Sequence, residues 1–119
     1  MNRLNEIEAR ANAATEGPWE AHGSLITSLT GPGGEVAEAS GQDTEFIAHA
    51  RTDVPDMAAA LRAVLEVHQD GGESQGYTDT GTYDFMPHCC TECGSLGEYG
   101  VPYPCPTVET IRQHLGDDL

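Results

Sequence analysis

Three cysteines toward the end of the chain have the spacing of a metal site. Cys90 and Cys93 form a Cys-x-x-Cys pair followed by Gly94, and Cys105 returns after a spacer of eleven residues. Two thiolates at positions i and i+3 can bind one tetrahedral ion, and a glycine permits the tight turn beneath it. Cys105 also stands directly before a predicted helix, whose N-terminal dipole favours a negatively charged sulfur. The spacing therefore predicts a bound metal ion, with structural zinc as the expected cofactor.

The sequence leaves the fourth ligand open. His68 would end a long predicted helix and connect it to the cysteines, while His88 lies two residues before Cys90. We rank His68 and His88 almost equally and Cys89 third, because neighbouring residues rarely reach the same tetrahedral ion. His114 is excluded, since the helix after the last cysteine places it more than about 10 Å away along the axis.

These residues give little support for a catalytic metal. A catalytic zinc keeps an open coordination position beside a general base, and Glu92, inside the Cys-x-x-Cys pair, is expected to face solvent. The deaminase pattern of His-x-Glu followed by Pro-Cys-x-x-Cys is not met, since His88 follows Pro87. An iron–sulfur cluster would fit poorly, because Cys89 and Cys90 are adjacent. We therefore expect a closed structural site and no catalytic residues.

A second group of residues can contact a small ligand. Trp19 offers a ring for stacking, and His49 and Arg51 offer positive charge at the end of a short predicted helix. Each also has an ordinary structural interpretation, as a core tryptophan and as surface side chains near Asp53. The sequence contains no phosphate-binding loop, dinucleotide fingerprint or G-x-S-x-G motif.

Charge limits the partners of this chain. Twenty acidic residues against five arginines and no lysine give the 119 residues a formal net charge of −15. Because such a surface repels phosphate backbones, duplex DNA is not expected as a ligand. The four cysteines favour metal over disulfides in a reducing compartment. No secretory signal and no membrane-spanning run are visible, so we expect a cytoplasmic protein.

The elements that position these residues follow from hydrophobic periodicity and turn signals. Residues 2–15 predict a helix that stops at Gly17–Pro18, and residues 19–21, 24–29 and 35–39 predict short strands. A glycine-rich turn at 31–34 joins the last two strands as a hairpin. A short helix follows from residue 43 or 44.

A second, longer helix is predicted from the capping signal at Thr52–Asp53 to about His68, with Pro55 in its first turn. Its apolar residues recur at helical spacing and fit one buried face; they are Val54, Met57, Leu61, Val64, Leu65 and His68. A last helix is expected from Thr107 to Leu115. Residues 70–103 have no sustained period, and a loop of that length needs a clamp such as the metal.

Together these patterns predict an α+β fold, with a short antiparallel sheet packed on three helices and a small zinc-clamped C-terminal lobe with a terminal helix. Residues 1–69 would form the helix–hairpin–helix core, 70–88 an irregular loop and 89–119 the zinc-binding lobe. We expect these parts to form one compact unit.

Two stretches and the C-terminal cysteines resemble the Ead-like small early proteins of bacteriophages. Residues 9–20 read Ala-Arg-Ala-Asn-Ala-Ala-Thr-Glu-Gly-Pro-Trp-Glu, and residues 43–55 contain Asp-Thr-Glu-Phe-Ile-Ala and end in Val-Pro. The segment from Cys-Thr-Glu-Cys-Gly (90–94) to Pro-Cys-Pro-Thr (104–107) is similar to versions in actinobacterial phages and prophages. The resemblance covers residues 4–68 and 90–115. It implies a phage accessory protein without an established activity and supplies no catalytic residue.

These observations predict a non-enzymatic phage or prophage accessory protein that binds a host macromolecule, with a host protein as the expected partner. A counter-defence or host-takeover role fits this origin, no membrane is involved, and a homodimer is compatible with the sequence. The alternative is a protein that sequesters a small ligand or nucleotide through Trp19, His49 and Arg51. A zinc-dependent hydrolase is the third hypothesis.

Overall fold

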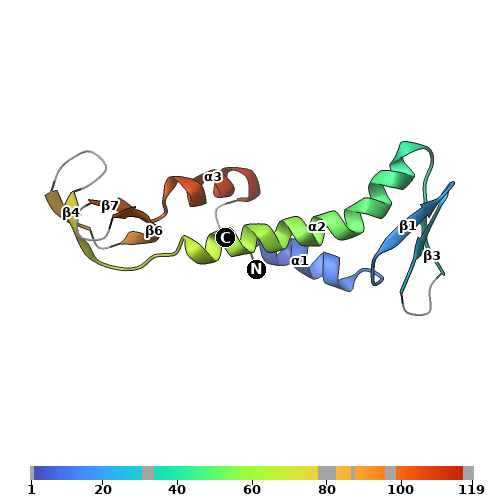
Figure 1. The fold of residues 1–119 in the computed structure, drawn as a ribbon, viewed down its shortest axis with the longest axis horizontal. Coiled ribbons are helices and arrows are strands. Elements are labelled where there is room, and N and C mark those ends of the chain that lie inside the picture. Colours follow the sequence, from blue (N-terminus) through green and yellow to red (C-terminus); the bar gives the residue numbers. More distant parts are fainter. Residues whose placement is uncertain (1, 31–33, 78–82, 87, 96–98, 117–119) are drawn as a thin grey trace. The chain divides into compact units, whose positions relative to one another are not determined.

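A computed structural model describes residues 2–30, 34–77, 83–86, 88–95 and 99–116 of the chain. Three helices and two small sheets make up these residues, so the α+β class predicted from the sequence is confirmed (Figure 1). The chain divides into two compact units, Met1–Ala60 and Leu61–Leu119. The boundary falls within the longest helix and not after residue 69.

An antiparallel sheet of three strands lies in the first unit, in the order β1–β2–β3. The strands are β1 (Trp19–His22), β2 (Leu25–Ser28) and β3 (Gly34–Glu38), close to the predicted positions. Gly23, in the tight turn between β1 and β2, has a φ of +62°, a conformation that glycine adopts without strain. Ile26 on the central strand is fully buried and anchors the sheet in the core.

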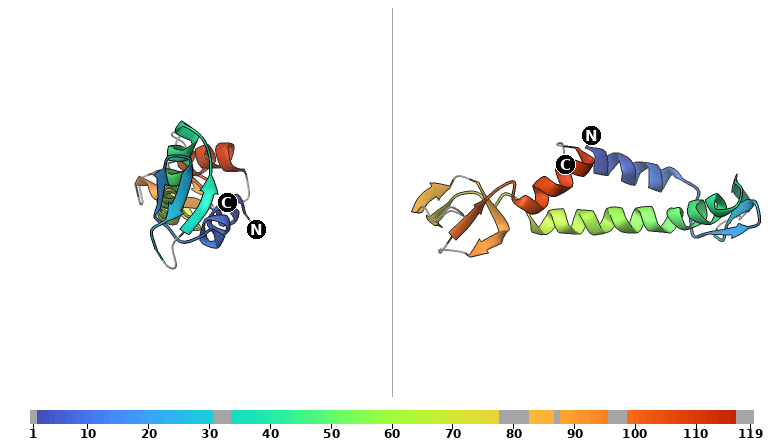
Figure 2. Two further views of the ribbon diagram at one scale, coloured as in Figure 1. Left: turned by 90° about the vertical axis from the view of Figure 1, so that its right-hand side faces the viewer. Right: turned by 90° about the horizontal axis from the view of Figure 1, so that it is seen from above.

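Helix α1 (Arg3–Ala13) begins at Asn2, whose side-chain oxygen accepts a hydrogen bond of 2.8 Å from the Asn5 amide. This N-cap satisfies one of the free amides of the first turn. Helix α1 runs alongside the first part of α2 (Gln42–Val67), in the opposite direction (Figures 1 and 2). The predicted N-terminal helix is therefore confirmed, ending two residues earlier than expected.

Helix α2 is continuous over 26 residues, so the break predicted at Thr52–Asp53 does not occur. Pro55 lies inside the helix, where its missing N–H forfeits the bond to the carbonyl four residues earlier. The helix continues because residues 57–61, which follow the proline, are strong helix formers, and three of them are alanine. None of the helices in the described parts of the chain is long and apolar enough to cross a membrane.

The predicted buried face of this helix is only partly covered. Val54, Met57 and Val64 are exposed by 37%, 59% and 36% respectively, whereas Leu61 and Leu65 are half-buried. Helical spacing shows that such residues share a face, but it does not show that another element covers that face. The prediction of one fully buried stripe is therefore wrong.

The second unit contains a sheet that the sequence did not predict. Its order is β5–β4–β7–β6, with antiparallel outer pairs and a parallel contact between the two central strands. The strands are β4 (Ser74–Tyr77), β5 (Tyr83–Met86), β6 (Cys89–Ser95) and β7 (Tyr99–Pro102). Residues 70–88 therefore do not form a wholly irregular loop. None of these strands shows a sustained alternation of apolar and polar residues, which is the pattern that indicates a strand.

Helix α3 (Pro106–Leu115) begins directly after Cys105, with Pro106 in the first position, where its missing N–H costs little. Its Val108 joins Cys90 and Cys105 in the buried core of the second unit, against which Leu65, Val101 and Tyr103 pack. Two of the three buried residues of this cluster are cysteines.

Candidate metal centre

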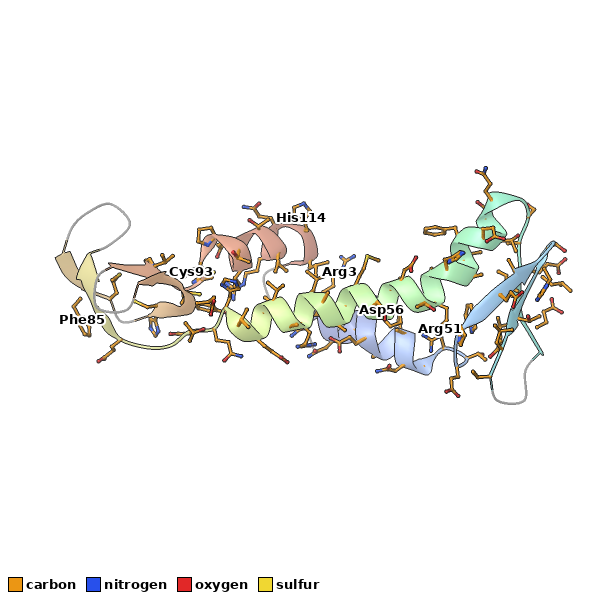
Figure 3. All side chains as sticks on the ribbon, in the orientation of Figure 1. Arg3, Arg51, Asp56, Phe85, Cys93 and His114 are labelled. Atoms are coloured by element: carbon orange, nitrogen blue, oxygen red, sulfur yellow. The ribbon has the colours of Figure 1, made fainter. Side chains whose placement is uncertain are left out.

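Four side chains in the second unit come together around one point. The Nδ1 atom of His68 lies 3.5 Å from the sulfurs of Cys90 and Cys93 and 3.6 Å from the sulfur of Cys105. All four potential ligand atoms lie within 4.8 Å of one another. Cys90 and Cys105 are buried, while His68 and Cys93 are half-buried (Figure 3 labels Cys93). This cluster can hold one metal ion.

Each side chain is placed by the element that carries it. Strand β6 supplies Cys90 and Cys93, and Gly94 directly after them has a φ of +87°, which favours glycine. His68 is held by the last turn of α2, where its amide donates to the Val64 carbonyl at 3.2 Å. Cys105 is the N-cap of α3, but its side chain makes no cap hydrogen bond and is free to face the cluster.

Thr91 connects the end of α2 to β6. Its hydroxyl donates to the Val67 carbonyl at 2.8 Å and accepts a bond of 3.1 Å from the Gln69 amide. The Thr91 amide in turn donates to the Gln69 carbonyl at 2.8 Å. These bonds fix the residues on either side of His68 against the strand that carries the Cys-x-x-Cys pair. This role was not predicted from the sequence, where a threonine between the two cysteines is its one sign.

Gly71 makes room for this connection. A Cβ atom at Gly71 would lie 2.9 Å from Cγ2 of Thr91, closer than real carbon atoms approach. The Gly71 amide also donates to the Cys89 carbonyl at 2.7 Å, so the backbone after α2 follows β6 closely.

The two alternative fourth ligands lie outside the cluster. His88 places its Nδ1 atom 2.7 Å from the Asp70 carboxylate and is exposed. Cys89 is buried, but it is not among the four clustered residues. A Cβ atom at Gly100 would lie 3.2 Å from the Cys89 sulfur and 2.6 Å from Met86 Cε, which places this thiol beside those two residues.

His114, excluded by the sequence, lies on α3 with its Nδ1 atom 3.0 Å from the Thr110 carbonyl oxygen. It is exposed and is not among the four clustered residues.

In the absence of a metal ion, the pKa values of two of the cysteines, Cys90 and Cys93, are shifted in opposite directions. Burial opposes ionisation of Cys90, but the backbone amides of Glu92 and Cys93, with hydrogen bonds from His68 and Cys105, lower its pKa to about 7. Burial, together with hydrogen bonds to the other two sulfurs, raises the pKa of Cys93 to about 12. Near neutral pH Cys90 therefore ionises far more readily than Cys93, and a cation at the centre of the cluster would displace the proton on Cys93.

Two of the three residues predicted to contact a small ligand come together in the first unit. Trp19 Nε1 and Arg51 Nε both donate to the carbonyl oxygen of Thr15, at 3.0 and 2.9 Å. The guanidinium carbon of Arg51 lies 6.0 Å from the centre of the tryptophan ring. His49 is not part of this arrangement, because it is exposed and its Nε2 lies 3.5 Å from the Glu45 carboxylate.

No protein-family model, curated protein or solved structure matches this chain. The resemblance to Ead-like phage proteins therefore stays a prediction.

Proposed function

We propose that His68, Cys90, Cys93 and Cys105 bind one zinc ion that stabilises the second unit. Bonds of about 2.3 Å to sulfur and about 2.0–2.1 Å to nitrogen give a tetrahedral zinc site a nitrogen–sulfur edge of about 3.6 Å. The three nitrogen–sulfur distances of 3.5, 3.5 and 3.6 Å agree with that edge, and this agreement carries the proposal. Three thiolates and one imidazole are also a common ligand set of structural zinc.

The number of ligands supports a structural role. Four protein ligands fill a tetrahedral coordination sphere and leave no position for a reactive water, which argues against the zinc hydrolase hypothesis. Two of the three buried residues of the described cluster, Cys90 and Cys105, would be ligands, so a bound metal would contribute directly to the folding of this unit.

For the whole chain, we propose a non-enzymatic phage or prophage accessory protein that binds a host macromolecule in the bacterial cytoplasm. The resemblance supports the origin, and the net charge of −15 favours a partner with a basic surface. Large apolar side chains exposed in both units favour a contact with apolar character; they include Leu29, Phe46 and Met57 in the first unit and Val67 and Phe85 in the second.

Elemental analysis tests the metal assignment. Protein purified without chelator is expected to contain about one equivalent of zinc. Cys90→Ser should abolish this content, whereas Cys89→Ser changes a neighbouring thiol outside the cluster and should retain it. Wild-type protein without bound metal, or equal loss in both variants, would refute the proposal.

Affinity capture from an actinobacterial lysate tests the partner. The immobilised chain should retain a specific host protein, which is released when the salt concentration is raised, because salt screens the charges between them. An unrelated acidic protein of similar net charge is the control. Recovery of the same proteins on both, or of none on either, contradicts the proposed binding role.

A further inference from the structure

We propose that a groove in the first unit binds a small amphipathic anion, a ligand with an apolar, ring-containing body and one acidic group. The groove lies between α1 and α2 and has a volume of about 490 Å³, within the range of small-molecule sites. Its walls are largely apolar and include Ile7 and Ala11 from α1, Ile47, Ala50 and Val54 from α2, and the ring of Trp19. Such walls take the apolar body of a ligand.

Positive charge is concentrated at this groove. Arg10 and Arg51 both line it, which makes two of the five arginines in a chain with twenty acidic residues. Over the residues that the structure describes, no carboxylate forms an ion pair with either guanidinium group. An anionic group in the groove would therefore gain two charge-assisted contacts that none of the described side chains already provides.

The surroundings of Arg51 direct an anion to the apolar side. Arg51 also lines a second hollow of about 260 Å³, which includes the acidic residues Glu16 and Asp56. These carboxylates repel an anion there, whereas the lining of the apolar groove contains no acidic residue.

Arg51 is held in place before any ligand binds. Its Nε donates to the Thr15 carbonyl, the same oxygen that accepts the bond from Trp19, so the guanidinium group and the ring are fixed side by side. The terminal nitrogens remain available to a ligand. A Cβ atom at Gly17 would lie 3.0 Å from Cγ of Arg51, so the absence of a side chain at Gly17 leaves room for the arginine side chain to pass.

The segment that supplies this oxygen is itself fixed to the sheet. Ser28 on β2 is buried, and its hydroxyl donates to the Glu16 carbonyl at 2.6 Å. The Thr30 hydroxyl donates to the Gly17 carbonyl at 3.0 Å. The Thr15–Trp19 segment is therefore a rigid support, and a site that is ordered in advance loses less entropy on binding.

A pair of fluorescent probes tests the charge of the ligand. The anion is 8-anilinonaphthalene-1-sulfonate, and its control is N-phenyl-1-naphthylamine, which has the same rings without the sulfonate. Because Trp19 is the only tryptophan, energy transfer from it to the probe reports binding near the groove. Zinc-containing full-length protein is expected to bind the sulfonate at least about tenfold more tightly than the neutral probe, through the two arginines.

Arginine variants locate the contact. Arg51→Met keeps the apolar stem and should weaken sulfonate binding about tenfold, with less than about a twofold change for the neutral probe. Arg10→Met changes an exposed side chain without a described structural bond, so it tests the charge even where Arg51→Met perturbs the Thr15 segment. Arg3→Met makes the same charge change outside the groove and should alter neither dissociation constant.

Phe46→Ser tests the apolar wall independently of charge, since Phe46 lines the groove but is 75% exposed, so its replacement leaves the core intact. It should weaken both probes. Equal binding of the two probes, or sulfonate binding that is unchanged in both the Arg51 and Arg10 variants, would overturn the proposal. Equal binding would instead indicate an apolar docking surface for a protein partner.

Discussion

At the scale of single residues, each member of the metal cluster is carried by backbone that neighbouring hydrogen bonds already fix. The His68 amide is bonded to α2, and the Cys105 carbonyl accepts a bond of 2.9 Å from the Glu109 amide of α3. Little backbone freedom remains to be lost when an ion binds, which favours tight binding.

Replacement of the two candidate histidines separates ligand from neighbour. His68→Ala removes one of four ligands and should lower zinc affinity at least about a hundredfold, more than the loss of an outer hydrogen-bond partner usually costs. His88→Ala breaks only the contact with Asp70 and should change affinity less than about threefold. Competition with a chromophoric chelator measures both affinities. A larger loss of affinity in the His88 variant would show that His88, and not His68, is the fourth ligand.

Zinc affinity should increase with pH. Above about pH 7 Cys90 is ionised while Cys93, with a pKa of about 12, keeps its proton, so zinc binding releases at least one proton. Below about pH 7 Cys90 is protonated as well, and at least two protons must leave. As the pH rises, the affinity should therefore increase at least about a hundredfold per pH unit below pH 7 and at least about tenfold per pH unit above it. Chelator competition between pH 6 and 8 measures this slope, and a flat profile would contradict thiolate ligation.

The sequence could identify three of the clustered residues because the Cys-x-x-Cys spacing is a local property of the chain. It could not choose between His68 and His88, because that choice depends on how the backbone after α2 returns along β6. The close contact of Gly71 with Thr91 directs this return, and a single contact of this kind leaves no repeating pattern in the sequence.

At the scale of elements, Thr91 is the contact that joins the end of α2 to β6. Thr91→Val keeps the shape of the side chain but removes two hydrogen bonds, so the zinc-bound second unit should lose about 1–2 kcal/mol of stability. Thr110→Val is the matched control, because Thr110 bonds only to a carbonyl of its own helix. Urea unfolding followed by tyrosine fluorescence measures the difference, and equal losses would contradict the role of Thr91.

The elements with regular spacing were predictable, and those without it were not. Helices α1 and α3 and the first sheet follow from apolar periodicity, caps and glycine turns. The division of α2 was predicted from the Thr52–Asp53 capping signal and Pro55, but the strong helix formers after the proline carry the helix through it. The second sheet escaped prediction because none of its four strands has a sustained alternation of apolar and polar residues, and because its two central strands, β4 and β7, pair across 22 residues.

At the scale of the whole molecule, the two units should differ in their dependence on metal. Trp19 reports on the first unit alone, and all four tyrosines lie between residues 77 and 103 in the second. After chelation under reducing conditions, tyrosine fluorescence should show loss of structure at residues 61–119. The tryptophan signal should keep a cooperative thermal transition. Simultaneous loss of both signals would show that the metal supports the whole chain.

The separation of the clustered residues along the chain also has a consequence in time. His68 and Cys105 are 37 residues apart, and the metal site cannot close until the later residue has been synthesised. At about 5–20 residues per second, a ribosome needs roughly 2–7 s for that interval. During those seconds the thiols of the new chain are open to oxidants and competing metals, while residues 1–60, the first compact unit, are already synthesised. If the four side chains bind an ion as proposed, the second unit is complete only once that ion has been supplied to the growing chain.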